Sequence, residues 1–220
     1  MSQIDGIIFD IETGPLPEEE LYKSMPRFTA PSNWVDAKKI EAKIQEQEEK
    51  WFSRAPLDAR TGEVVAIGIA DGKKTYILDA NSLSEFEILE AFWARVTESG
   101  PTKRWIGFNI KGFDLPFLFR RSLFYGISPN VQLRHARYWD DRFIDLLDVW
   151  SCGNRDQTIS LSNLSLFFGN KPKPESGSKF HKWLKTDPAI AAEYLINDLS
   201  LTANAAEKML PWINSPEVAA

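Results

Sequence analysis

The sequence contains little cysteine, little histidine and no long hydrophobic run, and each shortage excludes a class of protein. The single cysteine, Cys152, excludes an internal disulfide and a cysteine-rich zinc site, which suits a reducing cytoplasm. The two histidines, His135 and His181, are too few and too far apart for a histidine-rich metal centre, and we predict surface or capping roles for both. No stretch approaches the roughly 18 apolar residues of a membrane helix, and the N-terminal residues lack the basic region of a signal peptide. We therefore expect a soluble, unsecreted, cytoplasmic protein with no membrane partner.

Positive charge is also scarce, because 26 lysines and arginines stand against 31 aspartates and glutamates, for a net charge of −5. This balance argues against broad binding of duplex nucleic acid through a basic surface. It does not exclude a nuclease, since acidic metal ligands are counted here at full charge. Small basic clusters occur at residues 103–104, 120–121 and 134–137 and at Lys179, Lys182 and Lys185. We interpret each cluster first as a solvated face, with phosphate contact as the alternative.

The hydrophobic pattern predicts an α/β fold in which helices flank a mixed central sheet. A length of 220 residues fits one domain or one domain with a large insertion, and 43% apolar residues are enough for a packed core. The expected strands cover residues 4–11, 64–70, 75–78, 104–109 and 144–149, and the first strand stops at a turn over residues 13–15. The expected helices cover residues 83–96, 113–125, 161–168 and 188–209. We therefore predict a single domain over residues 1–220.

Residues 16–60 differ from the rest of the chain and predict a helical insertion after the first strand. They are proline-punctuated at both ends and highly charged between. Within them, residues 36–52 have the pattern of an amphipathic helix, with Ile40, Ile44 and Trp51 near helical spacing. We expect this helix to pack onto the body of the protein. It then either walls one side of a substrate cleft or stabilises a distant surface.

The first candidate site lies in Phe9-Asp10-Ile11-Glu12-Thr13-Gly14. Residues two apart on a strand point to the same face, so Asp10 and Glu12 project together. Two carboxylates on an otherwise apolar strand are costly to bury unless a cation lies between them. Mg²⁺ takes oxygen ligands of this kind, so the pair predicts a metal site, with two exposed strand-end acids as the alternative.

Two further segments carry candidate acidic residues. In Gly107-Phe108-Asn109-Ile110-Lys111-Gly112-Phe113-Asp114 a strand ends at Asn109 and Asp114 begins a helix, where an isolated aspartate is ordinarily an N-cap. In the last long helix Tyr194 and Asp198 lie four residues apart and so share one face. Each segment alone is weak evidence for a site.

The order, spacing and residue types of the three segments resemble the exonuclease motifs of the DnaQ-like (DEDD) 3′→5′ exonucleases. The similarity is greatest to freestanding relatives of the proofreading domain of family B DNA polymerases, and it fails over residues 16–60. The resemblance implies an RNase H-like fold and four acidic metal ligands, which here are Asp10, Glu12, Asp114 and Asp198. One branch of the family has a histidine five residues before the last aspartate, where this chain has Glu193. The other has a tyrosine four residues before it, which matches Tyr194.

The resemblance also implies a reaction. Two divalent metal ions, Mg²⁺ or Mn²⁺, about 3.5–4 Å apart would clamp the scissile phosphate and activate a water for hydrolysis. Tyr194 would orient that water by a hydrogen bond, since a phenol with a pKa near 10 is a poor base. Thr13 and Gly14 are candidates for contact with the terminal nucleotide, and Asn109 and Phe113 for contact with the next one. Phe113 is equally consistent with a core position.

We therefore predict a 3′→5′ exonuclease that acts on single-stranded or frayed 3′ ends, with DNA favoured over RNA. The alternatives are an RNA 3′ exonuclease with the same acids and a noncatalytic nucleic-acid-binding module on the same fold. A polymerase or helicase is a candidate partner in trans. Asp145 and Asp148 are interpreted as structural or surface residues, and Cys152 has no nucleophile partner in the pattern. The sequence leaves open the oligomeric state, the pathway and the role of the insertion.

Overall fold

A five-stranded mixed sheet forms the centre of the protein, with the strand order β3-β2-β1-β4-β5. The computed structural model describes residues 5–72, 74–129, 131, 142–152, 154, 156–170 and 177–213. His135 and the basic cluster at residues 134–137 lie outside these ranges. The strands are β1 (Ile7–Pro15), β2 (Gly62–Asp71), β3 (Lys74–Asp79), β4 (Trp105–Gly107) and β5 (Phe143–Asp145). β1 pairs with β2 and β2 with β3 in antiparallel fashion, whereas β4 is parallel to both β1 and β5.

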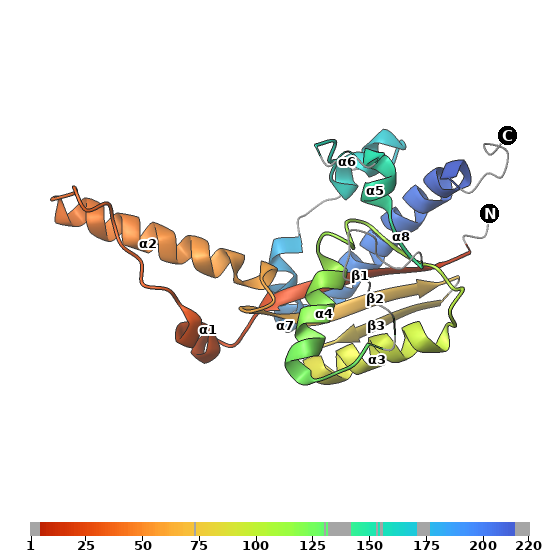
Figure 1. Cartoon of the computed structure of the whole chain (residues 1–220), viewed down its shortest axis with the longest axis horizontal. Coiled ribbons are helices and arrows are strands. Elements are labelled where there is room, and N and C mark those ends of the chain that lie inside the picture. The colour runs from red at the N-terminus through yellow and green to blue at the C-terminus, as the bar shows by residue number, and fades with distance from the viewer. Residues whose placement is uncertain are drawn as a thin grey trace.

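Helices cover both faces of this sheet (Figure 1). The helices are α1 (Glu18–Ser24), α2 (Ala37–Arg54), α3 (Glu85–Glu98), α4 (Asp114–Tyr125), α5 (Leu146–Ser151), α6 (Leu161–Phe167), α7 (Phe180–Thr186) and α8 (Pro188–Ile213), with short 3-10 turns η1 (Ala55–Leu57) and η2 (Gly177–Lys179). The core between the sheet and α3 and α4 is one cluster of buried side chains, and α7 and α8 pack against the opposite face. The expected α/β sheet flanked by helices is confirmed. Within the described part of the chain, no helix is both long enough and apolar enough to cross a membrane.

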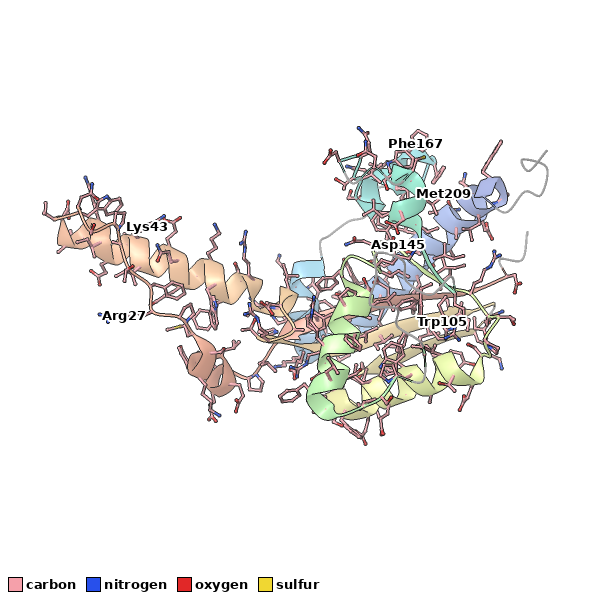
Figure 2. The ribbon with its side chains drawn as sticks, viewed as in Figure 1. Arg27, Lys43, Trp105, Asp145, Phe167 and Met209 are labelled. Atoms are coloured by element: carbon pink, nitrogen blue, oxygen red, sulfur yellow. The ribbon has the colours of Figure 1, made fainter. Side chains whose placement is uncertain are left out.

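The alternation of side chains along β1 decides which face receives the acidic residues. Phe9 is fully buried against α3, where its ring lies 5.4 Å from that of Phe92 and 5.7 Å from that of Trp105, which Figure 2 labels. Ile8 belongs to the cluster on the α8 side of the sheet. Because successive strand residues face opposite ways, Asp10 and Glu12 share the α8 side with Ile8.

Two strand boundaries differ from those the sequence predicts. β1 does not stop at a turn over residues 13–15, because Pro15 still pairs with Gly62 of β2, and the register shifts between Glu12 and Thr13. The register skips Val65, so the extra residue lies on β2 opposite Glu12 and Thr13, and such irregularities are common beside active sites. The strand expected over residues 144–149 is wrong after its second residue, because Asp145 caps α5 by accepting the Leu147 amide. The predicted hairpin is confirmed, and Gly72 (φ 61°) occupies the left-handed region that its turn requires.

The insertion forms a projecting arm instead of packing onto the body. The predicted helix is present as α2, and the Asp36 carboxylate caps it by accepting the amides of Lys38 and Lys39. However, no residue of α2 is buried, and Figure 1 shows it extending away from the sheet, with Lys43 far from the body in Figure 2. Instead, the chain before α2 runs back along the helix, and the Gln47 amide donates to the Thr29 carbonyl at 3.3 Å. We call residues 25–54 the arm.

A buried ion pair holds the end of the insertion against the body. The Arg121 guanidinium donates to the Glu85 carboxylate at 2.6 and 2.9 Å and to the Ala59 carbonyl at 3.1 Å. Glu85 also accepts the Val64 amide and the Tyr125 hydroxyl. One polar cluster therefore joins α3, α4, the start of β2 and the chain that returns from the arm.

Candidate metal centre and active site

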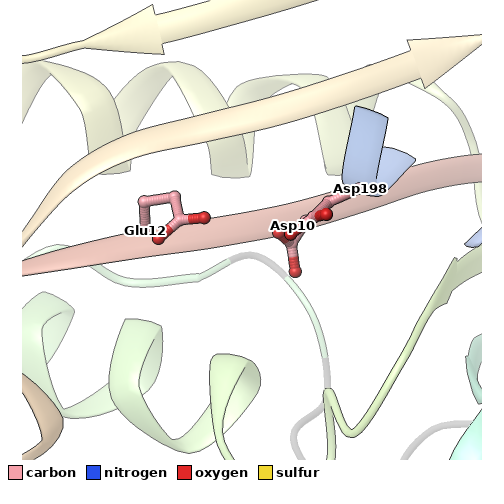
Figure 3. Close-up of side chains that lie close together, drawn as sticks. All are labelled: Asp10, Glu12 and Asp198. Atoms are coloured by element: carbon pink, nitrogen blue, oxygen red, sulfur yellow. The ribbon is translucent and has the colours of Figure 1, made fainter. Parts of the chain in front are cut away.

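Three carboxylates from two elements converge on the α8 side of β1. Asp10 and Glu12 extend from β1, and Asp198 reaches them from α8 (Figure 3). Each offers a carboxylate oxygen, and these three oxygens all lie within 4.8 Å of one another. Asp198 is 5% exposed and Glu12 is 9% exposed, so the group is largely shielded from water. Their negative charges repel at this range, and a bound cation relieves that repulsion.

Asp114 lies beside this group rather than in it. The Ile7 amide donates to the Arg104 carbonyl, on the edge of β1 that faces β4. Backbone amides of a strand point to alternate edges, so the Ile11 amide points to this edge as well. β4 ends at Gly107, and the Asp114 carboxylate accepts the Ile11 amide there at 3.1 Å. Phe113 occupies the N-cap position, so the interpretation of Asp114 as a simple helix cap is wrong. Burial and then the charge of Asp10 raise the pKa of Asp114 well above its ordinary value.

Asp145 fixes the loop that precedes Asp114 by hydrogen bonds to its backbone. Its buried carboxylate accepts the amide of Asn109 at 2.7 Å and that of Lys111 at 2.9 Å. Asn109 has a left-handed backbone (φ 59°), a conformation that asparagine tolerates better than most residues. The structural role predicted for Asp145 is confirmed by these bonds. Asp148 is an exposed residue paired with Lys111 at 3.4 Å, as its predicted surface role requires.

Tyr194 lies over the same carboxylates, and α7 holds it there. Its ring packs 6.0 Å from that of Phe180 and 5.5 Å from that of Trp183. Burial, and then the charges of Asp198, Glu12 and Asp10, raise the pKa of the Tyr194 phenol far above its ordinary value. The phenol therefore stays protonated near neutral pH and serves as a hydrogen-bonding group. α7 was not predicted from the sequence, because no capping side chain marks its start and no glycine marks its end.

A cavity of about 330 Å³ opens over the carboxylates. Its lining includes Asp10, Glu12, Asp198, Tyr194, Thr13 and Phe113, all of them candidates from the sequence, together with Ile11. Four further residues were not predicted, namely Ser53, Pro56, Leu57 and Gly177. A β-carbon added at Gly177 would lie 2.9 Å from the Tyr194 hydroxyl and 3.4 Å from a Glu12 oxygen, so a larger residue there would displace the Tyr194 hydroxyl. Nothing in the local sequence distinguishes these four, since distant segments bring them together.

The candidate substrate contacts divide into two groups. Thr13 and Phe113 line the cavity, and Phe113 also packs against the core and against the Phe117 ring at 5.5 Å. Gly14 does not line it, because a β-carbon there would lie 2.8 Å from Val65 and 3.1 Å from His181, which makes it a packing glycine. Asn109 is also outside the cavity lining.

The comparisons with known proteins first establish the fold. The structure is similar to that of the family B DNA polymerase from the hyperthermophilic archaeon Pyrobaculum calidifontis, with a TM-score of 0.60 and 20% identity. The similarity covers 93% of this chain but only 24% of the polymerase, so the chain spans about a quarter of that protein's length. The RNase H-like α/β fold expected from the sequence is thereby confirmed. A search of curated proteins by sequence finds no match.

The family follows from a match to residues 57–175, slightly more than half of the chain. The matching family model describes a predicted 3′-5′ exonuclease related to the exonuclease domain of PolB. The chain belongs to this family, and the resemblance stated from the three motifs is confirmed. The matched range contains Asp114 but begins after Asp10 and Glu12 and ends before Tyr194 and Asp198.

Proposed function

We propose that this protein is a metal-dependent 3′→5′ exonuclease that removes nucleotides from single-stranded or frayed 3′ ends of DNA. One observation carries the proposal: Asp10, Glu12 and Asp198 meet within 4.8 Å in a cavity that Tyr194 also lines. The family of predicted exonucleases and the fold shared with a DNA polymerase support it. That similarity also favours DNA over RNA as the substrate.

The donor set fits hard divalent cations. The cluster offers carboxylate oxygens alone, which Mg²⁺ and Mn²⁺ accept and which softer metals do not favour. Asp10, Glu12 and Asp198 would hold the ions, with Asp114 beside Asp10 as the fourth ligand. Two such ions supply the charge that activates a water and offsets the negative charge on the phosphate and the leaving 3′ oxygen.

The remaining residues position the reactants. Tyr194 donates or accepts a hydrogen bond that orients the attacking water, because its phenol stays protonated. Thr13 and Phe113 border the cavity: Thr13 contacts the terminal nucleotide, and the Phe113 ring stacks on the base of the next one. Ser53, Pro56 and Leu57 close the side toward the arm. A narrow cavity of this size favours unpaired ends, which need no melting to enter.

The setting of the reaction is part of the proposal. A DNA polymerase or helicase acts as a partner in trans, because the related exonuclease domain belongs to a polymerase. The single cysteine supports a cytoplasmic location.

Incubation with a 5′-labelled single strand of DNA tests the function directly. We expect a ladder of shortening products with Mg²⁺ or Mn²⁺, none with EDTA, and none from Asp198→Ala protein that retains its circular dichroism spectrum. A matched RNA strand distinguishes the two polymers, and a circular single strand, which has no end, should remain intact. Degradation of the circle would indicate an endonuclease, and full activity of the variant would exclude the proposed site.

A further inference from the structure

A second, larger cavity of about 880 Å³ lies next to the carboxylates. Ser53 and Pro56 line both cavities, so the two lie side by side at the junction of α2 and η1. The larger cavity lies between α7 on one side and α1, the end of α2 and η1 on the other. Its lining is Pro15, Leu16, Pro17, Glu18, Leu21, Phe52, Ser53, Pro56, Glu63, Lys179, His181, Lys182 and Lys185. We call it the lysine groove.

One wall of the lysine groove is basic. Lys182 and Lys185 are three residues apart on α7 and so share a face, and Lys179 precedes the helix. From Gly177 to Thr186 the chain carries no acidic residue, although the protein as a whole has a net charge of −5. His181 lines the groove between them, and burial and then the charges of Lys182 and Lys185 lower its pKa. The side chain is half-buried, so His181 is a surface residue that lines a groove and not an open face.

The opposite wall is apolar and aromatic. Leu21 is 4% exposed, and the half-buried Phe52 ring packs 5.8 Å from the Tyr22 ring. An apolar wall facing a row of lysines is the combination that proteins use for single-stranded nucleic acid, where bases contact rings and cations contact phosphates. Two acids, Glu18 and Glu63, also line the groove and oppose phosphate binding. Burial raises the pKa of Glu63, which weakens this opposition.

The basic wall continues directly from the carboxylate site. Gly177 lies against Tyr194 and Glu12, and Lys179 follows two residues later at the start of the groove. A strand whose 3′ end lies among the carboxylates therefore meets the lysines next. The smaller cavity has room for the reacting end, whereas three lysines spread along a longer groove suit several successive phosphates.

We propose that the lysine groove binds the phosphate backbone of the single strand on the 5′ side of the scissile bond. This inference rests on the proposed exonuclease function and identifies the path of its substrate. The groove places Lys182 and Lys185 on phosphates and Phe52 against a base. Bound in this way, an unpaired strand contacts the groove through both its phosphates and its bases. The alternative occupant is the leaving nucleotide, which needs only one phosphate contact.

Fluorescence anisotropy in EDTA measures DNA binding separately from catalysis. The probe is a labelled strand of 12 nucleotides, roughly the span of one single-strand site. The test variant is Lys182→Ala/Lys185→Ala. Its matched control, Lys74→Ala/Lys103→Ala, removes the same charge at the opposite end of β1, near Ile7. We expect the test variant to bind at least about five-fold more weakly, with the logarithmic salt slope smaller by about 1.4, which corresponds to two single-strand phosphate contacts. The control should match the wild type, and Glu63→Gln should bind more tightly.

Cleavage of a dinucleotide shows which part of the substrate occupies the lysine groove. A dinucleotide has no further internucleotide phosphate on the 5′ side of the scissile bond. The test variant should cleave it at the wild-type rate in Mg²⁺ while degrading the 12-nucleotide strand more slowly. Equal losses on both substrates would assign the groove to the leaving nucleotide and overturn the inference. Unchanged affinity and salt slope for the test variant would also overturn it. If the wild type cleaves neither substrate, the exonuclease function itself fails, and the anisotropy result still reports whether the groove binds DNA.

Discussion

At the scale of single residues, the site brings four acidic side chains close together. Asp10, Glu12 and Asp198 lie within 4.8 Å, and Asp114 is buried beside Asp10. Like charges at this distance in a partly buried place lower the stability of the metal-free protein. The same arrangement has a high affinity for divalent cations, so stability and metal binding are coupled.

Asp10→Asn removes one charge from this group without changing its shape. We expect kcat/KM to fall by at least about a thousand-fold, as for loss of several kcal/mol of transition-state stabilisation. In EDTA the variant should melt at a higher temperature than the wild type, by roughly 2–4 °C for each kcal/mol of repulsion removed. Steady-state cleavage kinetics with Mn²⁺ measures the first effect, and differential scanning fluorimetry in EDTA measures the second. Asp148→Asn, an exposed acid, is the control, and a lower melting temperature of Asp10→Asn in EDTA would contradict the charge argument.

Tyr194→Phe separates the hydroxyl from the ring. The Phe180 and Trp183 contacts remain, so the protein should fold and bind Mn²⁺ as the wild type does. The single-turnover rate should fall by roughly 10²-fold, the lower end of the contribution of one positioned proton-handling group. Rapid-quench kinetics measures the rate, and isothermal titration calorimetry measures Mn²⁺ binding. Loss of Mn²⁺ binding would instead show that the hydroxyl maintains the metal ligands.

Four site residues follow from sequence periodicity, and the others do not. Asp10 and Glu12 share a face because strands alternate, and Tyr194 and Asp198 share one because helices repeat every 3.6 residues. Gly177 and Ser53 reach the same cavity from distant segments, and no local pattern marks such tertiary contacts. Asp114 was predicted as a candidate, but its bond to the Ile11 amide depends on where β4 ends.

At the scale of elements, α1, α5, α7 and several strand ends are the parts that the sequence did not predict. α7 follows a segment rich in proline and glycine and, unlike the equally short α6, has no glycine after its last turn to mark its end. β1 continues through Gly14 and Pro15 because β2 supplies pairing partners as far as Gly62, which outweighs the local turn signal. Long periodic elements such as α3, α4 and α8 were predicted correctly to within a few residues. Tertiary pairing and packing therefore set the boundaries nearest to the site.

The Glu85–Arg121 pair should be a main source of stability where the arm joins the body. Arg121→Ala leaves the buried Glu85 carboxylate without its cation and the Ala59 carbonyl without its donor. We expect the free energy of unfolding to fall by roughly 3–5 kcal/mol, as for other broken buried pairs. Urea denaturation followed by circular dichroism measures it. Arg120→Ala, an exposed neighbour on the same helix, should change stability by less than about 0.5 kcal/mol.

His181 should make DNA binding depend on pH. Its pKa lies below the ordinary value of about 6.5, because it is partly buried beside Lys182 and Lys185, while Glu63 and Glu18 face the same groove. In the free protein the neutral imidazole is favoured. The stability that neutral His181 contributes is therefore fully present above about pH 6.5 and is lost as the pH falls through the lowered pKa. A bound phosphate raises the pKa again, so binding takes up a proton.

Wild-type affinity for a single strand in EDTA should therefore increase as the pH falls below about 6.5. Anisotropy titrations between about pH 5.5 and 7.5 measure this slope, and calorimetry in two buffers of different ionisation enthalpy counts the proton. His181→Gln should bind with a flatter pH dependence, because the remaining change comes from Glu63, whose pKa is raised by burial. An identical slope in both proteins would show that no phosphate lies near His181.

At the scale of the whole molecule, the arm has two parts with different surroundings. Its base, which includes Phe52 and Ser53, lines the lysine groove, and Ser53 reaches the carboxylate cavity as well. Its outer part projects from the body (Figure 1) and has no buried side chain in α2. The insertion as a whole is therefore proposed as a wall of the substrate path only at its base. The prediction that α2 packs onto the body is wrong. Only the base of the arm lines the groove, and the rest of the arm projects from the body.

Two deletions separate the parts. Removing residues 30–46 with a short glycine linker joins Thr29 to Gln47, which already lie within hydrogen-bonding distance, so the body should stay intact. Removing residues 18–54 also eliminates Leu21, Phe52 and Ser53, and with them one wall of the groove.

We expect the shorter deletion to keep wild-type affinity for a single strand and wild-type preference for single over blunt duplex ends. The longer deletion should weaken binding and reduce that preference, because duplex ends no longer meet the wall. Anisotropy and competition cleavage with both substrates measure these properties, and circular dichroism verifies folding. If the longer deletion folds with unchanged affinity and preference, the insertion forms no part of the substrate path.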